Sequence, residues 1–214
     1  MNPEETRARE AMTAHGRALF DRGLAHGTAG NISIRLDDGY LVTPTNSCLG
    51  RLDPADIAKL DMAGAPVSGK PASKEAFLHL MSYRRRPQDK AVVHLHSTHA
   101  VAVACMDHPS TEDVLPPLTA YYVMRVGKLP LAPYFPPGDE RLARAVAEMD
   151  ADARAVLLAN HGPIVSGPSL DGAVYAIEEL EETAKLFLML RSETVRPLTK
   201  AQVAALNETF NRTK

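Results

Sequence analysis

Two histidines, His94 and His96, stand two residues apart at the end of a short apolar stretch. Val92 and Val93 favour a β-strand, and the two-residue period of a strand points both histidines to one face and Leu95 to the other. Neutral imidazole nitrogen is a good ligand for zinc and related divalent metals, and two ligands on one rigid strand arrive already oriented. The pair therefore predicts part of a metal site.

A third histidine, His161, follows a second apolar stretch, residues 155–159, which predicts another buried strand. An isolated pair of histidines is a weak signal, because most such residues are ordinary buried or surface histidines. The third histidine and the upstream carboxylate of Glu75 strengthen the metal interpretation. Three protein nitrogens and one open position form a catalytic type of metal site, since the open position can accept substrate oxygens.

The composition is that of a globular protein. The 214 residues are 45% apolar and 23% charged, which argues against disorder and a fibrous role, and the length favours one domain spanning residues 1–214. A net charge of −2 without a basic half argues against nucleic-acid binding. The basic run 84–86 precedes Pro87, where cations complement the end of a helix; a phosphate-binding patch is the alternative.

The N-terminal residues are polar and charged, without the apolar core of a signal peptide, and the longest apolar runs are too short to cross a bilayer. The two cysteines, Cys48 and Cys105, form no C-x-x-C motif, which fits a reducing compartment. We therefore expect a cytoplasmic protein without a membrane-spanning segment.

The first half of the chain predicts a helix over about residues 3–22 and then a hairpin of strands 32–36 and 40–43. The loop before the hairpin, residues 27–31, either cradles an anion through free backbone N–H groups or is a simple glycine turn. A second polar loop follows at 43–47, and the glycines and prolines of residues 64–71 predict a further loop.

A helix is expected from Ser73, as its N-cap, to about residue 85. Glu75 would lie in its first turn, where an acid can simply complement the helix dipole. Its place between a polar loop and the strand that carries the histidines makes it a candidate functional residue. After the histidines, Ser97 is expected to cap another helix, and His99 is either a supporting residue of the metal site or a core histidine.

The second half predicts helices over residues 119–126, 138–149 and 169–191. The acids 178, 179, 181 and 182 of the long third helix are interpreted as a solvated face. The tail, residues 199–210, is expected to form a short amphipathic helix that docks on a neighbouring subunit.

Five motifs occur together in this order: Gly-Thr-Ala-Gly-Asn at 27–31, Thr-Pro-Thr at 43–45, Pro-Ala-Ser-Lys-Glu at 71–75, His-Leu-His-Ser at 94–97 and Ala-Asn-His-Gly-Pro at 159–163. On these motifs the chain resembles the class II aldolase/adducin family, from residue 27 to about residue 191. The resemblance implies an α/β protein with a three-layer α/β/α fold around a central, mainly antiparallel sheet. It also implies a homotetramer with active sites at subunit interfaces.

The resemblance implies roles for particular residues. Zinc would be held by His94, His96 and His161, with manganese as an alternative ion, and Glu75 would be the acid/base. A tyrosine from a neighbouring subunit would assist, with Tyr121 as the nearest match and Tyr122 as the alternative. The positions that match phosphate ligands of the family are Gly30, Asn31, Thr45 and Ser73.

The chain departs from the aldolase pattern at two positions. Lys74 stands where a small hydroxyl residue is usual, and we hypothesise that it contacts a phosphate or carboxylate of the substrate. Asn46 stands where glycine is usual after the threonine, and asparagine tolerates the left-handed backbone that the loop needs.

Within the family, the chain is most similar to enzymes that decarboxylate a phosphorylated four-carbon sugar acid. The resemblance thus implies a carbon–carbon lyase with a small phosphorylated substrate. The alternatives are an aldolase that releases dihydroxyacetone phosphate, a sugar-phosphate epimerase or dehydratase, and a non-catalytic adducin-like module. Glu75 disfavours the epimerases, which have aspartate at this point, and the intact histidines disfavour the module.

Overall fold

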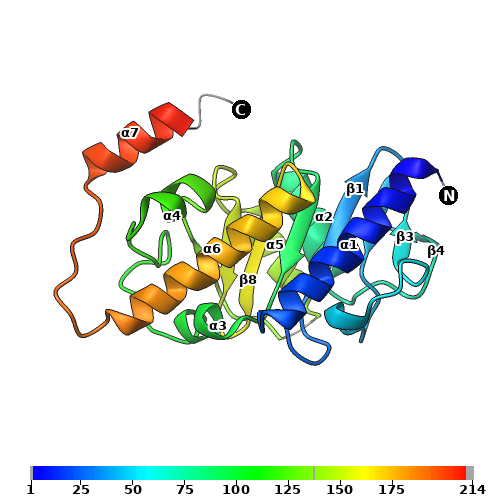
Figure 1. The fold of residues 1–214 in the computed structure, drawn as a ribbon, viewed down its shortest axis with the longest axis horizontal. Helices are drawn as coiled ribbons and strands as arrows, with labels where there is room; N and C mark the ends of the chain where they lie inside the picture. The colour runs from blue at the N-terminus through cyan, green and yellow to red at the C-terminus, as the bar shows by residue number, and fades with distance from the viewer. Residues whose placement is uncertain (1, 137, 211–214) are drawn as a thin grey trace.

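A single eight-stranded sheet forms the centre of the computed structural model, which describes residues 2–136 and 138–210 (Figure 1). The strand order is β4-β3-β2-β1-β5-β8-β7-β6, and all neighbours are antiparallel except β6 and β7. The mainly antiparallel central sheet is therefore confirmed. The strands are β1 Asn31–Leu36, β2 Gly39–Val42, β3 Ala58–Leu60, β4 Pro66–Ser68, β5 Ala91–His94, β6 Leu131–Ala132, β7 Ala155–Leu158 and β8 Gly162–Gly167.

Helices cover both faces of the sheet, because each strand sends alternate apolar side chains to opposite sides. Ala91 and Val93 of β5 pack in the core beneath α1, α3, α4 and α6, whereas Val92 packs in the core beneath α2 and α5. This arrangement confirms the three-layer α/β/α fold. The helices are α1 Pro3–Asp21, α2 Ala76–Arg85, α3 Thr98–Ala104, α4 Ala120–Arg125, α5 Glu140–Ala147, α6 Leu170–Met189 and α7 Lys200–Phe210, with a 3-10 turn η1 at Leu49–Arg51.

The strand order brings distant parts of the sequence together at one end of the central strands of the sheet. Strand β5 lies between β1 and β8, with Asn31 opposite His94 on one side and Ile164 opposite His94 on the other. The start of β1, the end of β5 and the turn before β8 therefore meet. His94 follows Val92 on the strand face that is covered by α2, so its side chain is directed toward the start of that helix.

Two local predictions were wrong. The predicted loop 64–71 contains a short strand, β4, which pairs with β3 at the edge of the sheet and is wholly exposed. Pro66 argued against a strand in the sequence, but proline is tolerated at the first residue of an edge strand, which is its position here. Helix α2 begins at Ala76 and not at Ser73, because the Ser73 N–H bonds to the Thr43 carbonyl and residues 73–75 form a turn.

The interpretation of the α6 acids as a solvated face was wrong for Glu181. This side chain is buried, and its carboxylate accepts hydrogen bonds from the backbone N–H groups of His99 and Ala100 at 2.9 and 2.8 Å. Ser97 does occupy the N-cap of α3, as expected, but its hydroxyl makes no capping bond. Glu181 thus satisfies the free N–H groups of α3 from another helix. It also bonds the His99 ring, which places His99 against α6.

The tail helix is confirmed as α7, which lies to one side of the layers and packs beside α4 (Figure 1). None of its described residues is buried. Its docking on a neighbouring subunit stays a prediction. Within the described part of the chain, no helix has the length and apolarity needed to cross a bilayer.

Helix α1 is attached to the sheet by a buried ion network. Arg9 donates to the Glu5 carboxylate at 2.9 Å and to the Ile57 carbonyl at 2.6 Å, and Lys59 of β3 donates to Glu5 at 2.9 Å. Burial raises the pKa of Glu5, but the hydrogen bonds and charges of Lys59 and Arg9 outweigh it and hold that pKa below its usual value. Glu5 therefore stabilises the fold in its ionised form.

We expect Glu5→Gln to lower the free energy of unfolding by about 3 kcal/mol at pH 7, because Arg9 would be left buried without its counter-ion. The folded-state pKa of Glu5 is depressed, so its contribution is present above the unfolded value, about 4.3, and is lost as the pH falls through the folded value. Urea unfolding at pH 7 and at lower pH, with the exposed Glu4→Gln as control, measures this difference. An equal effect of the two variants would refute the role of Glu5.

Candidate metal centre

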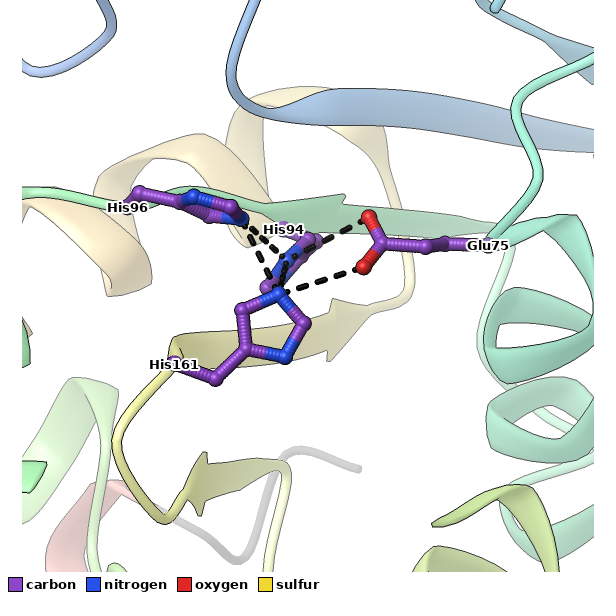
Figure 2. A group of neighbouring side chains, drawn as sticks. All are labelled: Glu75, His94, His96 and His161. Atoms are coloured by element: carbon purple, nitrogen blue, oxygen red, sulfur yellow. Dashed lines mark hydrogen bonds and ion pairs between the residues drawn. The ribbon is translucent and has the colours of Figure 1, made fainter. Parts of the chain in front are cut away.

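Four side chains from three parts of the fold converge at this end of the central strands (Figure 2). They are Glu75, His94, His96 and His161, and one ligand atom of each lies within 4.8 Å of the others. The His94 Nε2 atom is 3.0 Å from His96 Nε2 and 3.3 Å from His161 Nε2, and the remaining Nε2 pair is 3.1 Å apart. The structure therefore brings together the four residues that the sequence predicted.

These spacings fit a tetrahedral metal. A ligand nitrogen about 2.05 Å from zinc implies nitrogen atoms about 3.3 Å apart along a tetrahedral edge. The observed separations of 3.0 to 3.3 Å match that edge. Each histidine presents the same ring atom, Nε2, so the three nitrogens form one face of a tetrahedron. The cluster can hold a divalent metal ion and leave a further position for another ligand.

The tautomer of His94 suits metal binding. Its Nδ1 lies 2.8 Å from the Pro163 carbonyl oxygen. A carbonyl only accepts, so Nδ1 carries the hydrogen, and the neutral ring has a bare lone pair on Nε2 that faces the cluster. Burial lowers the pKa of His94 to about 3, so the ring is neutral at physiological pH. The pairing of β5 with β8 provides this carbonyl.

A tight turn places His161. The turn joins β7 to β8, and Asn160 has a positive φ of 55°, a left-handed conformation that asparagine adopts more readily than most residues. The Asn160 N–H bonds to the Ala104 carbonyl, and the His161 N–H closes the turn onto Leu158. This turn directs His161 back toward the end of β5.

Glu75 occupies the N-cap position of α2, and both oxygens of its carboxylate are used. Oε1 lies 3.1 Å from His161 Nε2, and Oε2 accepts from Asn31 Nδ2 at 2.7 Å. Burial raises the pKa of Glu75, but the hydrogen bonds to His161 and Asn31 outweigh it, so the pKa lies well below its usual value. Glu75 is therefore an ionised carboxylate that faces the histidine nitrogens.

Behind Glu75 lies a histidine that sequence reasoning missed. His79 is 1% exposed, and its Nε2 is 2.5 Å from Asn31 Oδ1. Burial is the main cause that lowers the pKa of His79 to about 3. The sequence feature that could have identified His79 is its spacing from Glu75. Residues four apart on a helix lie on the same face, and His79 follows Glu75 by four residues.

The two segments that carry the predicted phosphate ligands Thr45 and Ser73 lie side by side next to Glu75. The Thr45 N–H bonds to the Pro71 carbonyl, the Ser73 N–H bonds to the Thr43 carbonyl, and the Ser73 hydroxyl accepts from the Glu75 N–H at 3.2 Å. A cavity of about 300 Å3 opens beside these loops. Polar and charged side chains dominate its lining, namely Thr28, Thr45, Asn46, Ser47, Arg51 and Lys70 together with the carboxylates of Asp53 and Asp56.

The other candidates take distinct positions. Gly30 has a positive φ of 87°, and a Cβ there would meet the His94 carbonyl at 3.1 Å, so its backbone lies against the end of β5. Lys74 is exposed beside Glu75. Asn46 has a positive φ of 54°, which confirms the left-handed backbone expected of this residue.

The two tyrosines differ sharply in exposure. Tyr121 is 62% exposed on α4. It lines a cavity of about 700 Å3 together with Arg125 of α4 and residues of α6 that include Tyr175. None of the metal-cluster residues lines this cavity. Tyr122 is fully buried in the core. Tyr121 is therefore the tyrosine that a neighbouring copy of the chain could reach, and its assistance to catalysis stays a prediction.

The three-layer fold and the cluster of three histidines and a glutamate are those expected of a class II aldolase. The chain belongs to the family described as "Class II Aldolase and Adducin N-terminal domain", whose model matches residues 10–188. Among its relatives is a 3-oxo-tetronate 4-phosphate decarboxylase of Pectobacterium atrosepticum, 48% identical over 204 residues, which cover 95% of this chain and 94% of the relative.

Two further comparisons place the chain within the family. The crystal structure of YgbL from Escherichia coli, described as an aldolase, epimerase or decarboxylase, superposes with a TM-score of 0.92 at 48% identity and covers 94% of this chain and 98% of YgbL. An L-fuculose phosphate aldolase of Methanocaldococcus jannaschii is 36% identical over 173 residues, which cover 81% of this chain and 91% of the aldolase. The decarboxylases are thus the more similar of these two enzyme groups.

Proposed function

We propose that this chain is a metal-dependent lyase that decarboxylates 3-oxo-tetronate 4-phosphate to dihydroxyacetone phosphate and CO2, in the catabolism of four-carbon sugar acids. The observation that carries the proposal is the convergence of His94, His96, His161 and Glu75. It occurs in a chain that is 46 to 49% identical to decarboxylases of that name over most of its length.

The proposed reaction follows from the structure of the substrate. The carboxylate is attached to carbon 2, which bears a hydroxyl group and neighbours the ketone of carbon 3. Cleavage of the bond between the carboxylate and carbon 2 releases CO2, and the bonding electron pair is delocalised from carbon 2 onto the ketone oxygen. Uptake of one proton at carbon 2 then gives dihydroxyacetone phosphate.

A divalent cation held by the three histidines would supply Lewis-acid stabilisation of the charge that develops on the substrate oxygens. Glu75 delivers the proton to carbon 2. The side chain of Glu75 retains 15% exposure, and through this opening its carboxylate takes the proton up from solvent during turnover. The hydrogen bond from Asn31 holds the carboxylate in place.

The polar loops beside Glu75 bind the phosphate in this proposal. Gly30 contributes its backbone N–H, and Thr45 contributes its side-chain hydroxyl. The Ser73 hydroxyl retains its hydrogen for donation, because its oxygen accepts from the Glu75 N–H. Asn31 has a second amide hydrogen available beyond the one that it gives to Glu75. The cavity of about 300 Å3 next to Thr45 provides room for the phosphate end of the substrate.

We further propose zinc as the native ion, because zinc binds imidazole sites more tightly than manganese, which is the alternative. The whole chain, residues 1–214, would act as one domain in a homotetramer, with Tyr121 of a neighbouring subunit reaching the site. The exposure of Tyr121 supports this role. A cytoplasmic location is supported by the unpaired cysteines Cys48 and Cys105.

The direct experiment is incubation of zinc-loaded protein with 3-oxo-tetronate 4-phosphate, with CO2 and dihydroxyacetone phosphate measured against a chelator-treated control. Metal-dependent release of both products in equal amounts is the expected result. If neither product forms, the decarboxylase proposal fails.

A sugar-phosphate aldolase is the second candidate, and the 36% identity to the archaeal L-fuculose phosphate aldolase favours it. The same protein preparation would then be incubated with dihydroxyacetone phosphate and short aldehydes. Condensation of dihydroxyacetone phosphate with an aldehyde, without any decarboxylation of 3-oxo-tetronate 4-phosphate, would identify the chain as an aldolase.

Lys74 offers a test of the proposed substrate charge. We expect Lys74→Ser to raise KM about tenfold with kcat little changed, because a charge-assisted hydrogen bond to a substrate anion would be lost. Steady-state kinetics measure this split, and the exposed Lys90→Ser serves as control. An unchanged KM would make Lys74 an ordinary surface lysine.

A further inference from the structure

A continuous chain of hydrogen bonds runs from Glu75 into the protein interior. Glu75 Oε2 accepts from Asn31 Nδ2 at 2.7 Å, and Asn31 Oδ1 lies 2.5 Å from His79 Nε2. His79 Nδ1 lies 2.7 Å from Ser33 Oγ, which is 2.8 Å from Tyr83 Oη. We call these five residues the Glu75 relay. Four of them lie behind the carboxylate and are not among the predicted metal ligands.

The spacing of these residues explains how one interface holds them all. Glu75, His79 and Tyr83 are four residues apart at the start of α2 and along it, so they share one helix face. Asn31 and Ser33 are two residues apart on β1, so they share one strand face. The relay therefore lies in the contact between β1 and α2, beside the apolar side chains that form the core on this side of the sheet.

Burial makes the relay's hydrogen bonds obligatory. Asn31 is 5% exposed, His79 is 1% exposed, Tyr83 is 2% exposed and Ser33 is fully buried. A buried polar group without a partner is costly, so each member needs the next one. The relay is a complete network in which every side chain finds a partner.

When Glu75 is ionised, only one assignment of donor and acceptor atoms satisfies every hydrogen bond of the relay. A carboxylate only accepts, so Asn31 turns its amide nitrogen to Glu75 and its oxygen to His79. His79 must then donate from Nε2, which leaves Nδ1 bare in the neutral ring to accept from the Ser33 hydroxyl. The oxygen of Ser33 in turn accepts from Tyr83.

We infer that His79 is a positioning residue for Glu75: by donating from Nε2 to Asn31 it fixes the amide orientation that presents an N–H to the carboxylate. If the amide of Asn31 rotated by half a turn, its oxygen would face the Glu75 oxygen, and the two acceptors would repel each other. The relay thus restrains Oε2, which also lies 3.5 Å from His94 Nε2, while Oε1 lies 3.1 Å from His161 Nε2. The inference rests on the proposed role of Glu75 in proton delivery.

Two substitutions of His79 test the inference. His79→Leu removes the donor, and we expect kcat to fall by about 10- to 100-fold, the range seen when groups that orient metal-site residues are lost. His79→Gln keeps an amide that can donate to Asn31 and accept from Ser33, and we expect kcat within about threefold of the wild type, by the same donor–acceptor inventory. Metal content and KM should be little changed in both variants.

A core variant separates positioning from stability. Leu78 is fully buried on the same helix but lies outside the relay. We expect Leu78→Ala to lower the melting temperature without lowering kcat at temperatures where it is folded. A loss of kcat in Leu78→Ala as large as that in His79→Leu would overturn the inference, as would failure of His79→Gln to restore kcat.

A structural measurement makes the inference independent of the substrate. In crystals of metal-free His79→Leu, we expect the contact between Asn31 Nδ2 and Glu75 Oε2 to be lost, and in His79→Gln we expect it to be kept. Persistence of the contact in His79→Leu would overturn the inference. If His79→Leu does not fold, Ser33→Ala takes its place, because it removes the donor that fixes the His79 tautomer. A wild type without lyase activity would refute the proposed function and leave this structural test valid.

Discussion

His94→Ala is expected to lose both metal and turnover. His94 is fully buried at the centre of the cluster, and its Nε2 lies within 3.3 Å of the other two histidine nitrogens. Loss of a group that merely orients a ligand lowers metal affinity 10- to 100-fold, so loss of a ligand should lower it by more than about 100-fold. Lewis-acid stabilisation is worth several kcal/mol, which corresponds to a fall in turnover of about 1,000-fold.

Metal analysis of the purified variant and a competition titration with a chromogenic chelator measure the first effect, and the decarboxylase assay measures the second. His108→Ala is the matched control, because His108 is a partly buried histidine that bonds the Val103 carbonyl outside the cluster. Retention of metal by His94→Ala would remove His94 from the ligand set. Retention of activity without metal would contradict the Lewis-acid proposal as a whole.

The positions of the metal-site residues could be predicted because they depend on local rules. The two-residue period of a strand places His94 and His96 together, and the structure keeps this alternation even though β5 ends at His94 and His96 lies just beyond it. The left-handed backbone at Asn46 also follows from a local preference of asparagine. The meeting of His161 and Glu75 with this pair required knowledge of the fold, which the family resemblance supplied.

The features that were missed depend on contacts between distant residues. Glu181 is buried because α3 places two unpaired N–H groups against α6, and that contact joins residues 82 positions apart in the sequence. His79 is 48 residues from Asn31, its partner on β1. The short strand β4 forms only because β3 offers it an edge. In each case the sequence shows an ordinary acid, histidine or loop, and the tertiary neighbour determines its role.

Glu75→Gln is expected to separate metal binding from chemistry. Three histidine nitrogens remain in place to hold the ion, so the metal content of the variant should equal that of the wild type. The amide has almost the same shape and can still accept from Asn31, but it cannot take up and deliver a proton. Removal of a general acid/base lowers rates by about 100- to 10,000-fold, and we expect a loss of kcat in this range.

The comparison of metal content with kcat in one variant is what makes this test sharp. Glu148→Gln is the matched control, because Glu148 is an exposed acid that follows α5 and does not belong to the cluster. A loss of metal together with kcat in Glu75→Gln would make Glu75 a required metal ligand. A kcat near the wild-type value would mean that another group protonates carbon 2. We expect His94→Ala to lose the metal and Glu75→Gln to keep it, while both lose most of their turnover. Measured together, the two variants therefore distinguish the residues that hold the ion from the group that moves the proton.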